Sequence, residues 1–289
     1  MSSPMDHRTE RTGSEELEPA MLALVESGRR PIALFFKTMF HTPQVRTTVV
    51  LLYVTLAITL WASIPRDEPL LQVVPTGAQV LVPQDFRPDM TCGERCLKLL
   101  THAPKIWGTF LLFGLFPFLI AKGLGGRKMA DYGVRFGNRA TFWLTLVVLP
   151  PLFVGVWLSG MSTSFYRIYP LNPWALGGAT TWAEGWGFFV LHSVMYALMY
   201  YGCWEFFYRG FLQTELTPVV GCCTAVLIQT MASTLVHIGH PLPEILGALV
   251  AGLLWGFCAY RTQSLLSGLL QHMLIGVVLD ISLIWHAMG

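Results

Sequence analysis

The sequence predicts an all-α fold, a polytopic membrane helical bundle with about seven to eight transmembrane helices. The first observation is composition: of 289 residues, 53% are hydrophobic and only 12% are charged, whereas a soluble domain usually carries about 25% charged residues. The second is length, because several apolar stretches approach the roughly 20 residues that a helix needs to cross a bilayer. These stretches cover residues 47–64, 107–121, 141–160, 186–208, 218–237, 245–260 and 264–285.

The charge of the chain excludes one class of partner. The formal net charge is +2, and the sequence contains neither a basic run nor a Gly-rich phosphate loop, so we expect no nucleic-acid partner. The first strong apolar stretch begins near residue 47, which is too late for a cleavable signal peptide. We therefore expect an uncleaved, multi-pass integral membrane protein in contact with the lipid bilayer.

Composition divides the chain into three parts. Residues 1–28 are polar and mixed in charge, so we expect an N-terminal tail there. Residues 29–160 are expected to form an N-terminal transmembrane region with an external loop at 65–106. Residues 186–288 contain the late apolar stretches and are expected to form the core that carries the chemistry.

The distribution of Lys and Arg predicts the orientation of the bundle. Basic residues flank the first apolar stretch, and the 122–140 loop contains five more, whereas the 161–185 loop contains only Arg167. Cytoplasmic loops are enriched in Lys and Arg. The N-terminus and the 122–140 loop are therefore expected in the cytoplasm.

A few ionisable side chains lie inside the apolar stretches. Each costs at least about 2.5–3.5 kcal/mol in the middle of a bilayer, so such residues face a partner or a wet cavity and are functional candidates by default. They are His192, Glu205, Arg209, His272 and Asp280, with His237 at the end of a stretch.

Glu205 and Arg209 are four residues apart and share one face of a helix. One interpretation is that the two charges only neutralise each other. The other is that Glu205 is part of a reactive site and Arg209 supports it.

Two histidines follow on later helices. His237 ends an apolar stretch, while His240 lies in the Gly/Pro turn after it and is expected to be solvated. His272 is in the middle of a stretch, with Asp280 two turns away on roughly the same face. A carboxylate and two imidazoles could activate a water molecule and hold an oxyanion, or they could bind Zn²⁺ and leave a fourth position for water. Sequence spacing does not separate these alternatives.

The late helices resemble a known family. EFFYRGFL at 205–212, the histidine that ends the next stretch, and GLLWGFCAYRTQSLLSGLLQH at 252–272 are similar to the motifs of the CPBP intramembrane protease family. This family includes type II CAAX prenyl proteases and bacteriocin-processing or immunity proteins. Its motifs are Glu-Glu-x-x-x-Arg-Gly, Phe-x-x-x-His and His-x-x-x-Asn or Asp. The resemblance covers about residues 186–288, and MADYGVRFG at 129–137 is similar to a segment found before the domain.

The resemblance implies a helical bundle with a cavity in which a glutamate-activated water hydrolyses a peptide bond. Carried onto this chain, it implies that Glu205 is the general base, that His237 orients the water and that His272 donates to the oxyanion. Arg209 and Asp280 would be supporting residues. We expect no cofactor, with zinc held by Glu205, His237 and His272 as the alternative.

The chain departs from the family pattern at three positions. Trp204 stands in place of the first glutamate, Ser233 in place of the phenylalanine and Gly276 in place of the asparagine or aspartate. One hypothesis is therefore an intramembrane endopeptidase that cleaves a membrane-associated peptide or protein, with a prenylated CAAX peptide as one candidate. The other is an inactive member that acts as a membrane binding, scaffold or immunity protein.

Three further expectations concern location and structure. The chain is expected in a bacterial inner membrane, or in the endoplasmic reticulum if it is eukaryotic. Gly252 and Gly256 are expected to let two helices pack closely. Straight helices would place Glu205 and His237 at opposite ends of neighbouring spans, so the helices must be offset, tilted or broken for the two residues to meet.

Overall fold

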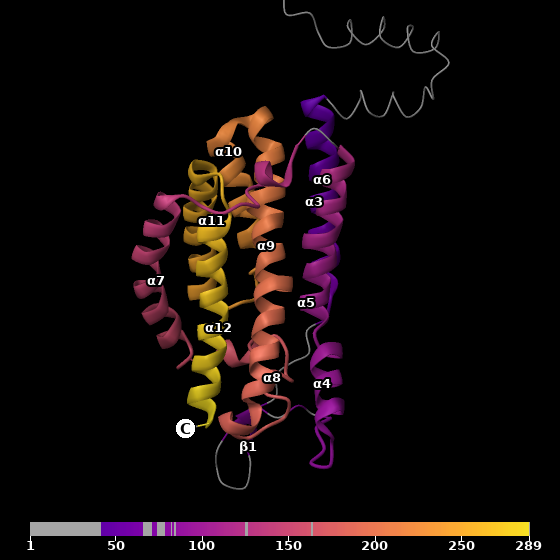
Figure 1. Ribbon diagram of the computed structural model, residues 1–289, viewed down its shortest axis with the longest axis vertical. Helices are drawn as coiled ribbons and strands as arrows, with labels where there is room; N and C mark the ends of the chain where they lie inside the picture. Colours follow the sequence, from indigo (N-terminus) through magenta and orange to yellow (C-terminus); the bar gives the residue numbers. More distant parts are fainter. Residues whose placement is uncertain are drawn as a thin grey trace, which may run out of the picture.

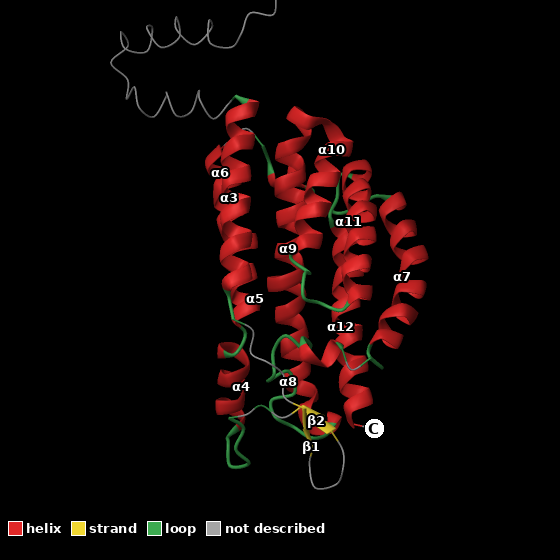
Figure 2. Ribbon diagram, turned by 180° about the vertical axis from the view of Figure 1, so that it is seen from behind, coloured by secondary structure: helices red, strands yellow, loops and turns green. Residues whose placement is uncertain are grey.

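The computed structural model of the protein describes residues 42–65, 71–73, 79–81, 83, 85–124, 127–162 and 164–288. The expected tail at 1–28 lies outside these residues. The described chain forms an elongated bundle of helices, and Figure 2 shows strands only in one small hairpin at one end.

The described elements follow one another along the chain as helices and short helical turns, with one strand pair near the start. They are α3 (Pro43–Ser63), β1 (Leu71–Val73), β2 (Gln79–Leu81), α4 (Cys92–Thr101), α5 (Pro104–Thr109), the π-helical segment η1 (Phe110–Leu115), α6 (Phe116–Leu124), the 3₁₀ turn η2 (Met129–Tyr132), α7 (Arg139–Ser159), the 3₁₀ turn η3 (Phe165–Arg167), α8 (Trp182–Met195), the π-helical segment η4 (Tyr196–Gly202), α9 (Cys203–Glu205), the π-helical segment η5 (Phe206–Leu212), α10 (Gln213–Leu235), α11 (Leu242–Thr262) and α12 (Leu266–Met288). The strands β1 and β2 are antiparallel, with Leu71 opposite Leu81.

The predicted all-α membrane bundle is confirmed. Within the described residues, six helices are long and apolar enough to cross a membrane, and one of them runs from Trp182 to Leu235. This long helix consists of two pieces that meet at Gly221. When the long helix is counted as two, the number of long helices among the described residues is consistent with the expected seven to eight.

Gly221 breaks the long helix. Its φ of 77° and ψ of 164° lie in a region that is essentially restricted to glycine. The arm that follows, residues 222–235, is shorter than the roughly 20 residues of a full crossing, so it differs from the crossing helix expected at 218–237. Glu205 and His237 each lie sixteen residues from Gly221. The chain therefore turns back at Gly221 and returns His237 to the level of Glu205. This is the kind of helix break that we expected, because straight helices would hold the two residues apart.

The loops of the bundle gather at two opposite ends. Figure 1 shows the start of α3 and the connection between α6 and α7 at the same end, while α4 and the β-hairpin lie at the opposite end. At that opposite end, α4 begins with a reciprocal cap between Thr91 and Glu94. Cys92 and Cys96 are one turn apart in α4, and both are free thiols.

The close packing expected at Gly252 and Gly256 is confirmed. A Cβ atom at Gly252 would stand 2.7 Å from the side chain of Thr230, and one at Gly256 would stand 2.6 Å from the amide nitrogen of Gln229. The Gln229 amide donates to the Gly252 carbonyl at 2.9 Å, and the Gln213 amide donates to the Gly256 carbonyl at 2.9 Å. Small residues on α11 therefore expose backbone carbonyls that polar side chains of α10 bind.

A buried ion pair between Arg46 and Glu215 connects α3 to α10. The Arg46 guanidinium on α3 donates to both carboxylate oxygens of Glu215 on α10, at 3.0 and 2.8 Å, and also to the Leu124 carbonyl. The Tyr132 hydroxyl donates to the same carboxylate at 2.5 Å. This bidentate geometry is the strong form of a charge-assisted hydrogen bond.

Candidate active site

Glu205 stands in the short helix α9, between two π-helical segments, η4 and η5. Such wide turns are common at functional sites. The Glu205 carboxylate is buried and accepts from Nδ1 of His272 at 2.8 Å and from Nη1 of Arg209 at 3.3 Å. The structure thus brings together Glu205, Arg209 and His272 from two different helices.

Asp280 does not join this group. It is buried on α12 and lies 3.0 Å from Nε2 of His192 on α8, with both side chains about 1% exposed. Asp280, expected to support the site, therefore pairs with His192 and connects α8 to α12.

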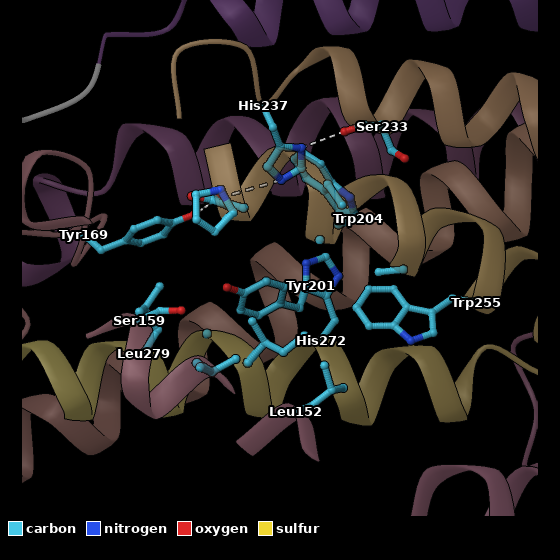
Figure 3. Close-up of a pocket in the computed structure, with 18 of the residues that line it drawn as sticks. Leu152, Ser159, Tyr169, Tyr201, Trp204, Ser233, His237, Trp255, His272 and Leu279 are labelled. Atoms are coloured by element: carbon cyan, nitrogen blue, oxygen red, sulfur yellow. Dashed lines mark hydrogen bonds and ion pairs between the residues drawn. The ribbon is translucent and has the colours of Figure 1, made fainter. Parts of the chain in front are cut away.

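A cavity of about 200 Å³ opens beside these helices. Figure 3 shows His237 and Trp204 on one side, Tyr201 and His272 on the other, with Trp255 and Tyr169 at opposite ends. Side chains of α7 complete the wall, among them Leu152, Val156 and Ser159. Arg209 lines the cavity, whereas Glu205 is not among its lining residues.

His237 enters the cavity from the loop between α10 and α11. Its Nδ1 lies 2.7 Å from the Ser233 carbonyl, which can only accept, so Nδ1 carries the hydrogen and Nε2 carries the lone pair. Burial lowers the pKa of His237 to about 4, which keeps the ring neutral at pH 7. The edge of the Trp204 indole packs against this ring at 5.7 Å between centroids.

His240 and Glu244 were not expected to belong to a site, and the structure places them beside His237. His240, expected to be solvated, has a side chain only 7% exposed, and its Nδ1 lies 2.8 Å from Oε1 of Glu244. The Tyr169 hydroxyl donates to the same oxygen at 2.6 Å. Nε2 of His237 lies 3.9 Å from it. The signal in the sequence was a glutamate four residues after His240, one helical turn away.

Trp204 occupies the position of the missing first glutamate of the motif. Its ring is 3% exposed and stacks on Tyr200 at 5.6 Å, with edge contacts to Trp61 at 5.4 Å and Phe113 at 5.5 Å. An aromatic cluster that joins α3, η1 and α9 therefore replaces a carboxylate.

Gly276 occupies the position of the missing asparagine. A side chain there would collide with the hydroxyl and ring of Tyr201, which fill the space next to it. The Tyr201 ring also packs on His272, with centroids 4.4 Å apart, and both residues line the cavity. A phenol hydroxyl therefore stands close to where the family motif would place an amide.

The described part of the chain contains no group of three or more His, Cys, Asp or Glu side chains placed to hold a metal ion. The three residues considered as zinc ligands, Glu205, His237 and His272, do not form such a group. Glu205 and His272 are in contact, while His237 lies across the Trp204 ring and faces Glu244 instead.

The described residues thus form a helical membrane bundle with ionisable side chains around a cavity between its helices. Residues 186–278 match the family model described as "Type II CAAX prenyl endopeptidase Rce1-like". The match supports the assignment of this part of the chain to the CPBP family and ends before Asp280. No curated protein and no solved structure matches the chain.

Proposed function

We propose that the protein is an intramembrane endopeptidase that hydrolyses a peptide bond of a membrane-associated substrate with an activated water. One observation carries the proposal: His237, from the α10–α11 loop, and His272, from α12, line the same cavity, and each is held at Nδ1 by an acceptor. Both rings can therefore present Nε2 to a substrate. The family match supports peptidase activity in general.

Glu205 acts through His272 in this mechanism. Its carboxylate fixes the His272 tautomer and favours the charged ring, as the carboxylate of a catalytic triad does. Arg209 holds the carboxylate in place from the neighbouring turn. The general-base role expected for Glu205 from the sequence is not proposed, because Glu205 does not line the cavity where the water would attack.

His272 and Tyr201 supply the donors for the oxyanion. A tetrahedral intermediate needs hydrogen-bond donors aimed at the oxygen where charge develops. The Tyr201 hydroxyl is adjacent to the His272 ring, which donates through Nε2 when it is protonated, and the hydroxyl stands beside the glycine that replaces the motif's amide. The mechanism uses no metal.

The substrate enters from the lipid side. The α7 wall of the cavity belongs to a helix whose other residues, such as Leu146, Val147 and Val154, expose apolar side chains, so a lipid-anchored segment meets no polar barrier there. A prenylated C-terminal CAAX peptide is one substrate class, and an unmodified membrane peptide is the other.

The test uses the full chain in proteoliposomes with farnesylated and unmodified fluorogenic peptides. We expect cleavage of one of the two classes, and we expect Glu205→Gln and His272→Ala each to abolish it. Zinc chelation with 1,10-phenanthroline is expected to leave the rate unchanged. Full turnover by either variant would remove the role given to that residue, and no cleavage by the wild type would remove the proposed activity.

A second function has its own observation. Trp204 and Gly276 replace two reacting groups of the family, which favours an inactive member that binds a membrane peptide or partner. In that case Glu205→Gln would leave binding intact, bulky changes such as Ala251→Trp in the cavity would abolish it, and Trp204→Glu would create cleavage that the wild type lacks.

A further inference from the structure

Glu244 has no role in the mechanism above, although its side chain lines the cavity beside His237. Glu244 stands in the first turn of α11, whereas His237 precedes that helix by one short turn. The two side chains meet because the loop between α10 and α11 folds back on itself, with the His240 amide bonded to the His237 carbonyl at 2.9 Å.

The hydrogen-bond pattern around Glu244 and His237 lacks a donor. Oε1 of Glu244 already accepts from Tyr169 and is bonded to His240. Oε2 of Glu244 is buried and has no partner among the described residues. Nε2 of His237 presents a lone pair, since Nδ1 is the nitrogen bonded to a carbonyl. Nε2 of His237 and the Glu244 carboxylate are thus two neighbouring acceptors with no hydrogen between them.

A water molecule satisfies this pattern. The 3.9 Å between Nε2 of His237 and Oε1 of Glu244 is too long for a direct hydrogen bond and short enough for one water to bridge. A water has two hydrogens to donate, so it can donate one to the imidazole and the other to the carboxylate.

We propose that Glu244 is the water-activating carboxylate of this protein, supplied from α11 in place of the glutamate that Trp204 replaces. The inference rests on the proposed endopeptidase function and assigns the base of that reaction. His237 orients the attacking water, and Trp204 fixes the His237 ring by its edge contact.

The reaction balances as a simple hydrolysis. The water oxygen bonds to the peptide carbonyl carbon while one of its protons passes to the Glu244 carboxylate. His272 and Tyr201 hold the negative oxygen. The C–N bond then breaks, Glu244 returns the proton to the departing nitrogen, and the products are a carboxylic acid and an amine.

A purely structural role for Glu244 can be separated from this one. Glutamine at 244 keeps the shape and can still accept from Tyr169 through its amide oxygen, but it cannot take a proton. Glu184 is the matched control, because it also lies in the first turn of a helix, α8, and it is exposed and is not among the residues that line the cavity.

The experiment measures cleavage of the fluorogenic peptides in proteoliposomes for the wild type, Glu244→Gln, Glu244→Ala and Glu184→Gln. We expect Glu244→Gln to lose about 10²–10⁴-fold in kcat, the range of general-base catalysis, with KM and Tm unchanged. Formate or azide is expected to restore part of the activity of Glu244→Ala, which a structural role would not produce. Glu184→Gln is expected to cleave at the wild-type rate.

Three outcomes contradict the proposal, and each is distinguishable. Wild-type kcat in Glu244→Gln would overturn the role of Glu244 and leave the endopeptidase function intact. A loss in Glu244→Gln that tracks a fall in Tm, without rescue of Glu244→Ala by formate, would make Glu244 a structural residue. An inactive wild type would overturn the endopeptidase function and this role together.

Discussion

The hydroxyl group of Tyr201 fills the space in which a side chain at Gly276 would stand. Tyr201 belongs to the π-helical segment η4, and Gly276 belongs to α12, so the contact joins two walls of the cavity. Gly276 departs from the family motif, but the Tyr201 side chain can take its position only because residue 276 has no side chain.

Gly276→Ala is expected to destabilise the protein by about 1–3 kcal/mol, the usual cost of overpacking a close-packed core. It should also lower the cleavage rate, because Tyr201 must move away from His272. Thermal unfolding in detergent and kcat measure the two effects. Since the clash is with Tyr201, the cost should shrink in a Tyr201→Ala background.

Gly187→Ala is the control for this substitution. Gly187 is also in a helix, and a Cβ atom there meets nothing within 4 Å, so alanine should be neutral or slightly stabilising. Equal costs for the two alanines, or a cost at Gly276 that does not depend on Tyr201, would contradict the packing described.

Gly221→Ala is expected to cost about 1–3 kcal/mol, because alanine is strained in the backbone conformation of Gly221. Relief of that strain would extend the helix and shift the short arm, so the cleavage rate should fall by more than the loss of folded protein explains. Comparison of kcat with the folded fraction at one temperature measures this. A variant with wild-type Tm and kcat would show that the break does not depend on glycine.

Arg46→Met is expected to destabilise the protein by about 3–5 kcal/mol, because it leaves the buried Glu215 carboxylate without its main partner. The double variant Arg46→Met, Glu215→Leu should recover part of this loss, since both charges are then removed. Thermal unfolding of the single and double variants gives the coupling. Arg87→Met, at a surface pair 3.8 Å long with both side chains largely exposed, should cause no measurable change.

Asp280→Asn tests whether Asp280 belongs to the site. Because Asp280 pairs with His192 in a buried position, we expect a loss of Tm with an unchanged kcat of the folded fraction. His192→Gln should behave in the same way. A loss of kcat at unchanged Tm would place Asp280 in the reacting group, as the sequence suggested.

Much of the fold could be predicted from the sequence, because the lipid environment imposes it. Apolar length located most helix ends to within a few residues, although the helix expected at 186–208 continues to Gly221. The cost of burying charge singled out Glu205, Arg209 and His272, which do form one group. The small residues Gly252 and Gly256 predicted the α10–α11 packing for the same kind of reason, since only their backbone carbonyls are polar there.

The rest depended on geometry that a linear pattern does not contain. Gly221 has no local signal that separates a broken helix from a tolerated glycine, so the apolar pattern predicts a full span where the structure has a short arm. Glu244 follows a Pro-rich turn and looks like an ordinary first-turn carboxylate. The position of Tyr201 beside Gly276 depends on how two helices are rotated against each other, which the π-helical segments alter.

The break at Gly221 also restricts the lengths that this region can have. One residue added between Glu205 and Gly221, or between Gly221 and His237, would move the far end of that segment by about 1.5 Å and rotate it by about 100°. Either Glu205 or His237 would then turn away from its neighbours. An insertion on one side of Gly221 cannot be offset by an insertion of any length on the other side. The added residues must also make up whole helical turns, because otherwise the side chain faces another direction. The number of residues from Glu205 to His237 therefore determines whether the two side chains reach the same level of the bundle and face the same neighbours.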